Sequence, residues 1–166
     1  MDKHVLSTAL PAFQNSGSDD EDQKDAAVEA QRLKALGIAF AEQGNWESAL
    51  GSWNRAVQLA PIDGHLHELC AQALNETGKA WAAVQAATRA CGLLPQSCDA
   101  LMTLARAQLN LGEPKLAVAS MERVLKIQSE HPEALSEIEE VRALACRQDQ
   151  LGAGIRAFVS GPPSRG

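Results

Sequence analysis

The chain has 166 residues, of which 45% are apolar, so it is long enough for one ordinary domain with tails. Its formal net charge is −6, and residues 1–29 hold seven acids against two lysines, which leaves the remainder close to neutral. The sequence therefore has no basic stripe of the kind that binds nucleic acid or an anionic membrane. It also has no apolar run approaching the roughly 20 residues that cross a bilayer.

Residues 1–24 are predicted to form an acidic, disordered tail, because they are polar and show no hydrophobic period. The first residues, MDKHVLSTALPAF, have a short and broken apolar stretch without a basic region, which argues against a signal peptide. We therefore expect an intracellular protein, in the cytoplasm or the nucleus. Ser16 and Ser18 precede a run of acids, a pattern typical both of acidophilic kinase substrates and of solvating tails.

Beyond this tail the sequence repeats itself with a step of 34 residues. One glycine and one alanine recur in each unit, at Gly44, Gly78, Gly112 and at Ala49, Ala83, Ala117. Apolar residues recur at helical spacing on both sides of the glycine, so each unit is predicted to be a pair of helices. The glycine supplies the left-handed backbone conformation that ends the first helix, and the small alanine lets the two helices approach closely.

The repeats predict an all-α solenoid, residues 25–148, of three helix–turn–helix units followed by a capping helix. We place the units at about 30–63, 64–97 and 98–131, and the capping helix at about 132–148. Residues 149–166 are rich in Gly, Pro and Ser and are predicted to be a flexible tail.

The first unit resembles the tetratricopeptide repeat (TPR) family. The residues that carry this resemblance are Leu36-Gly37, Phe40, Gly44, Trp46, Ala49, Trp53, Ala56 and Pro61. The second and third units keep the small residues and lose the aromatics. The resemblance implies stacked helical pairs whose first helices line a concave groove, and a module that binds a protein or peptide partner.

The columns that line this groove in the family are polar and mildly acidic here. They carry Lys34, Ile38, Glu42, His65, Glu68, Gln72, Asn75, Glu76, Asp99, Met102, Arg106 and Asn110. Two cations face four acids, so the resemblance implies a partner segment that is polar or basic. The leading hypothesis is a non-enzymatic adaptor within a larger complex, and the alternative is a chaperone-associated cofactor that uses a different surface.

Some TPR domains hold the acidic C-terminus of a heat-shock chaperone with a clamp of Lys, Asn and Arg side chains. The clamp columns carry Lys34, Ile38, Leu69, Asp99 and Thr103 in this sequence. Only Lys34 matches, and Asp99 would repel a carboxylate that the clamp must bind. We therefore expect that the partner is not the acidic C-terminus of a heat-shock chaperone.

The tryptophans have different expected roles. Trp46 and Trp53 occupy columns that are aromatic in ordinary repeats, so packing is favoured over a ligand platform for both. Trp81 lies one column beyond the usual aromatic position, and we expect it to be partly exposed. Exposed tryptophan is enriched at binding hot spots, which makes Trp81 a candidate contact.

The sequence carries no catalytic or metal-binding signature. His65 and His67 are two residues apart and point to different sides of a helix, and the four cysteines form no CxxC pair. No base or oriented partner accompanies any cysteine, as a catalytic thiol would require. We therefore expect reduced thiols, no cofactor, no metal, no small-molecule substrate and no enzymatic activity.

Overall fold

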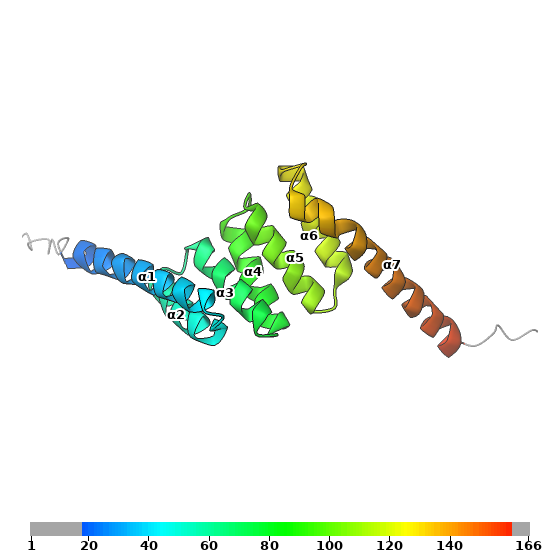
Figure 1. Ribbon diagram of the computed structural model, residues 1–166, viewed down its shortest axis with the longest axis horizontal. Helices are drawn as coiled ribbons and strands as arrows, with labels where there is room; N and C mark the ends of the chain where they lie inside the picture. Colours follow the sequence, from blue (N-terminus) through cyan, green and yellow to red (C-terminus); the bar gives the residue numbers. More distant parts are fainter. Residues whose placement is uncertain (1–17, 161–166) are drawn as a thin grey trace, which may run out of the picture.

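The computed structural model describes the backbone of residues 18–160 and the side chains of residues 21–153. All regular structure in this part of the chain is α-helical. The helices are α1 (Ser18–Glu42), α2 (Trp46–Leu59), α3 (Gly64–Glu76), α4 (Ala80–Leu93), α5 (Cys98–Asn110), α6 (Pro114–Ile127) and α7 (Pro132–Ser160). They pack as the pairs α1–α2, α3–α4 and α5–α6, and α7 closes the stack against α6 (Figure 1). The predicted solenoid of three helical pairs and a capping helix is confirmed.

The glycine that recurs in each unit adopts the predicted left-handed backbone conformation. Gly44, Gly78 and Gly112 have φ angles of 72°, 73° and 86°, a region that other L-residues rarely enter. After each glycine the chain reverses and the second helix of the pair begins. The first of these second helices, α2, is capped by Asn45, whose side chain accepts from the backbone N–H of Ser48 at 3.2 Å.

Trp53 fastens the first pair of helices together. Its side chain is 1% exposed, and its indole Nε1–H donates to the backbone carbonyl of Lys34 at 3.1 Å. The ring lies on Gly37, where an added Cβ would come within 2.7 Å of Trp53 Cε2 and closer still to Nε1. The interpretation of Trp53 as a packing residue is therefore confirmed.

This contact leads to a prediction for Gly37. Gly37→Ala is expected to destabilise the domain by about 1–2 kcal/mol, because the clash with a buried indole outweighs the roughly 1 kcal/mol gained in helix propensity. Gly51→Ala is the matched control, since Gly51 lies in α2 with no atom within 4 Å of an added Cβ. Chemical denaturation should show the control to be as stable as the parent or more so. A Gly37→Ala variant as stable as Gly51→Ala would contradict the packing described here.

Two predicted boundaries differ from the structure. Helix α1 begins at Ser18, inside the segment 1–24 predicted to be disordered, and α7 continues to Ser160 instead of ending near residue 148. Acidic residues near a helix N-terminus are generally stabilising, so an acidic run in the sequence is compatible with the start of a helix. The glycines near the end of α7 cost only about 1 kcal/mol each in helix propensity and do not stop the helix. Residues 1–17 and 161–166 lie outside the described residues.

Candidate functional site: the concave groove

Three adjacent hollows run along the first helices of the stack and together form what we call the concave groove. The first hollow is lined by Lys34, Ile38, His65, Glu68, Leu69 and Asp99. The second is lined by Ile38, Ala41, Glu42, Trp46, Trp53, Leu69 and Gln72. The third is lined by Trp46, Gln72, Asn75, Glu76, Thr103, Arg106 and Asn110. Neighbouring hollows share lining residues, so the groove is continuous from α1 to α5.

Eleven of the twelve predicted groove residues line one of these hollows. Met102 is the exception, because it is 2% exposed and belongs to a core cluster that also contains Ala134 and Ile138 of α7. The prediction that Met102 lines the groove is therefore wrong, because its side chain is part of the core at the end of the stack. That the other eleven residues bind a partner remains a prediction.

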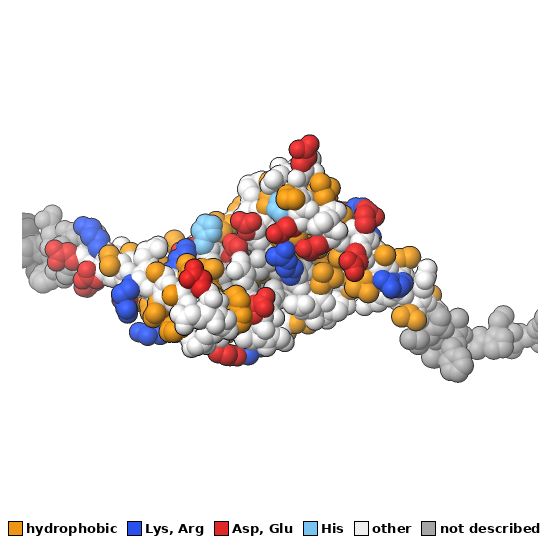
Figure 2. Space-filling model, in the orientation of Figure 1, with side chains coloured by type: hydrophobic (Ala, Val, Ile, Leu, Met, Phe, Trp, Pro, Cys, Tyr) orange, Lys and Arg blue, Asp and Glu red, His pale blue; other side chains and the backbone are white. Residues whose placement is uncertain are grey.

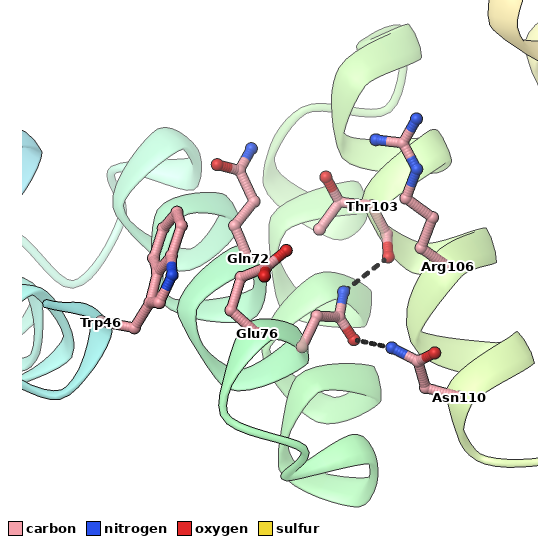
Figure 3. A pocket seen from close by; sticks show the side chains of 7 residues that line it. Trp46, Gln72, Glu76, Thr103, Arg106 and Asn110 are labelled. Carbon is pink, nitrogen blue, oxygen red and sulfur yellow. Dashed lines mark hydrogen bonds between the residues drawn. The ribbon is translucent and has the colours of Figure 1, made fainter. Parts of the chain in front are cut away.

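The third hollow has an ordered polar floor (Figure 3). The amide nitrogen of Asn75 donates to the backbone carbonyl of Thr103 at 3.5 Å, and the amide of Asn110 donates to Asn75 Oδ1 at 3.3 Å. Trp46 stands on the α2 side of the hollow and Arg106 on the α5 side. A hollow with an aromatic wall and satisfied amides can hold an extended segment by hydrogen bonds and apolar contact.

Trp46 is the groove residue that sequence reasoning missed. It is half-buried, packs against the core cluster that contains Trp53 as predicted, and also lines both the second and the third hollow. Trp53 is buried between helices and borders only the second hollow. The two residues are seven apart and share one face of α2, so periodicity alone assigns them the same role. The sequence signal that could have distinguished the two tryptophans is their position in the helix. Trp46 lies in the first turn of α2, directly after the capping residue Asn45.

Both cationic side chains of the groove form ion pairs with acids of the same chain. Lys34 Nζ lies 3.5 Å from Asp63 Oδ2, and Arg106 Nη2 lies 2.7 Å from Glu133 Oε2. Among the described residues no ion pair engages Glu42, Glu76 or Asp99, which line the same groove. The charge that the groove offers to a partner is therefore negative.

Glu68 lies in an environment that disfavours the ionised form of its carboxyl group. It is 8% exposed, and burial raises the pKa of its carboxyl, with the nearby charge of Asp99 raising it further. Two weaker interactions act in the opposite direction: Gln72 donates to Glu68 Oε1 at 3.2 Å, and His65 Nδ1 lies 3.8 Å from Oε2. A cation brought by a partner would stabilise the ionised form of Glu68 far better than these neighbours do.

Two predicted residues lie outside the groove. Trp81, on α4, is 64% exposed and lines none of the three hollows, so the expectation that it is exposed is confirmed while its role as a contact stays a prediction. Ser16 lies outside the described residues. Ser18 is the first residue of α1, and its side chain is outside the described part.

The remaining titratable groups show no catalytic arrangement in the described part of the chain. Burial raises the pKa of the Cys70 thiol to about 11 and also raises the pKa of Cys91, so both thiols stay protonated near neutral pH. Residues 21–153 contain no group of three or more His, Cys, Asp and Glu side chains that could hold a metal ion. Among the described helices, none has the length and apolar character needed to span a membrane.

Comparison with known proteins agrees with the repeat architecture. Family models described as tetratricopeptide repeat match residues 34–97 and 99–131. The chain is 40% identical over 104 residues to tetratricopeptide repeat protein 33 of Xenopus laevis, covering 63% of this chain and 40% of that protein. It is 37% identical over 115 residues to the Mus musculus protein of the same name, covering 69% of this chain and 44% of that protein. The chain thus spans less than half the length of these relatives.

Solved structures with the same fold include two TPR domains of RPAP3. The first TPR domain of human RPAP3 superposes with a TM-score of 0.70 at 21% identity, covering 74% of this chain and 96% of that domain. The first TPR of Spaghetti (RPAP3), bound to the HSP90 peptide SRMEEVD, gives a TM-score of 0.69 at 24% identity. The match covers 72% of this chain and 95% of that chain. Identities this low establish the fold alone. With its 34-residue period, its glycine turns and both family matches, the chain belongs to the tetratricopeptide repeat family.

Proposed function

We propose that this protein is a non-enzymatic adaptor that binds a basic polypeptide segment in its concave groove, as part of a larger complex. The observation that carries the proposal is the charge balance of the groove. Lys34 and Arg106 are neutralised by acids of the protein itself, whereas Glu42, Glu76 and Asp99 are unpaired within the described residues. A basic segment would complement these acids, and such complementarity selects partners and speeds their association.

The groove also offers apolar contacts between its acidic positions. Ile38 is 40% exposed and lines two hollows, and the half-buried Trp46 follows it along the groove. A segment that alternates apolar and basic side chains would place the apolar ones on Ile38 and Trp46 and the basic ones near Glu68 and Glu76. The stack of three repeats is long enough for an interface of ordinary size, roughly 800 Å² on each partner.

A chaperone-linked role is the second candidate, and the fold similarity to TPR domains solved with HSP90 and HSP70 peptides favours it. The acidic tail itself is a poor match for this groove. Of the clamp positions only Lys34 is basic, its ammonium is already paired with Asp63, and Asp99 would face the incoming carboxylate. A chaperone-associated cofactor built on this chain would therefore use a surface other than a carboxylate clamp.

Peptide titration tests whether the groove selects a basic segment over an acidic chaperone tail. Fluorescence anisotropy would compare a labelled peptide of alternating Leu and Lys/Arg with an acidic peptide ending in EEVD. We expect only the basic peptide to bind, and we expect Glu68→Lys with Glu76→Lys to weaken it by about tenfold or more. The control, Asp25→Lys with Glu130→Lys, makes the same change in net charge at exposed sites outside the groove. Tight binding of the acidic peptide would refute the groove assignment.

Glu68→Gln is expected to raise stability while it weakens binding of the basic peptide. The folded-state pKa of Glu68 is raised above its ordinary value of 4.5, so its contribution to stability is present below that value and is lost as the pH rises through the folded pKa. At pH 7 the ionised carboxylate therefore costs stability. Its neutral isostere should raise the melting temperature by about 1–3 °C at pH 7, and the gain should disappear near pH 4. A variant that melts lower at pH 7 would show that Glu68 is structural.

A further inference from the structure

The capping helix α7 carries an exposed face that the groove proposal does not use. We define this α7 face by Glu137, Glu140, Leu144, Arg147 and Leu151. Two shallow hollows lie along it, between α7 and the end of α5, and both include Leu109, Leu144 and Arg147. Hydrophobic, acidic and basic side chains gather on this slope of the molecule (Figure 2). Leu144 and Leu151 are 44% and 70% exposed and lie on the same face of α7.

Polar contacts join the described part of α7 to the solenoid as far as Asp149. The last polar contacts from the described part of α7 to another element are the bond from the Gln148 amide to the Gly112 carbonyl, at 3.1 Å, and the ion pair Lys115–Asp149. Helix α7 nevertheless continues to Ser160.

The charges on the α7 face have opposite signs on the two sides of Leu144. Glu137 and Glu140 lie on the N-terminal side of this leucine, and Arg147 and Leu151 lie at nearly equal sequence distances on the C-terminal side. Among the described residues, neither Glu140 nor Arg147 takes part in an ion pair. When two such helices pack antiparallel with Leu144 in contact with its counterpart, Glu140 of each helix lies near Arg147 of the other.

We propose that the α7 face is a self-association surface, on which a second copy of this chain packs its own α7 antiparallel about a two-fold axis at Leu144. Glu140 of each copy then lies beside Arg147 of the other, and Leu144 and Leu151 are covered. An isologous contact of this kind uses the same patch twice, so self-complementary charge is the property it requires. About four helical turns take part, which places the interface among weak, concentration-dependent ones.

The first test is the mass of the full chain in solution. Sedimentation velocity across about 5–200 µM should show a monomer–dimer equilibrium that Leu144→Glu shifts by at least tenfold toward monomer. Leu135→Glu is the matched control: Leu135 is 51% exposed on the same helix, and nine residues from Leu144 place it on the opposite face. A chain that stays monomeric throughout this range, or a dimer that is equally sensitive to both variants, would overturn the proposal.

Charge exchange tests the antiparallel register. Glu140→Arg alone and Arg147→Glu alone should each weaken the dimer, because each places like charges opposite one another twice. The double variant E140R/R147E should restore association to within about threefold of the parent, since it exchanges the two signs. In a Cys146→Ser background, Leu144→Cys should form a disulfide-linked dimer under mild oxidation. Failure of the double variant to restore association would rule out the proposed pairing.

Discussion

Replacing Trp53 with alanine is expected to lower the free energy of unfolding by about 3–5 kcal/mol. The side chain is 1% exposed, fills the space above Gly37 and donates a hydrogen bond to the Lys34 carbonyl. The truncation leaves a cavity in the first helical pair and removes the indole hydrogen bond to the Lys34 carbonyl. At about 2–4 °C per kcal/mol for a domain of this size, the melting temperature should fall by about 10 °C.

Trp81→Ala is the matched control for this prediction. Trp81 is 64% exposed on α4, so its truncation should change stability by less than about 0.5 kcal/mol. Urea denaturation followed by circular dichroism measures both variants under the same conditions. Equal losses for the two variants would mean that Trp53 is not the packing centre of the first repeat.

Ala83→Trp is expected to destabilise the domain by about 3 kcal/mol, the upper end of what overpacking costs. Ala83 is fully buried in α4, at the column that also carries Ala49 and Ala117. An indole cannot fit there unless α3 and α4 separate. Because each repeat is stabilised mainly by its neighbours, loss of the middle repeat should weaken the whole stack.

Gln85→Trp is the control that separates the effect of placing tryptophan at a buried position from the effect of introducing tryptophan into α4. Gln85 lies two residues along α4 and is exposed, so an indole there meets solvent. Its melting temperature should remain within about 2 °C of the parent, while that of Ala83→Trp falls. An unchanged melting temperature for Ala83→Trp would show that the 34-residue register is misplaced.

The repeat architecture could be predicted from the sequence because it follows from local rules. A glycine at Gly44, Gly78 and Gly112 ends a helix by its backbone freedom, and the intervening apolar period specifies two helices. Eleven groove residues could be placed on one surface for the same reason, since equivalent columns of a regular stack face the same way. These features follow from the repeat pattern, which can be recognised in a single sequence.

The structure differs from the sequence-based predictions mainly at the ends of the repeat array and of its helices. Met102 belongs to a core cluster that it shares with residues of the capping helix, and α7 extends past the predicted boundary. Trp46 and Trp53 share one face of α2, yet Trp46 lines the groove from the helix end while Trp53 lies inside the helical pair. Each outcome depends on what packs against a residue, which sequence spacing does not record.

The sequence by itself determined the fold class, the period, the turn positions and the acidic excess of the groove columns, because these depend on residue type and spacing along the chain. The tertiary structure decided which charges remain available. It pairs Lys34 with Asp63 and Arg106 with Glu133, so the cations that the sequence shows in the groove are neutralised by acids distant in sequence. Distances between such residues are set by helix packing, and electrostatic complementarity to a partner emerges only when those distances are known.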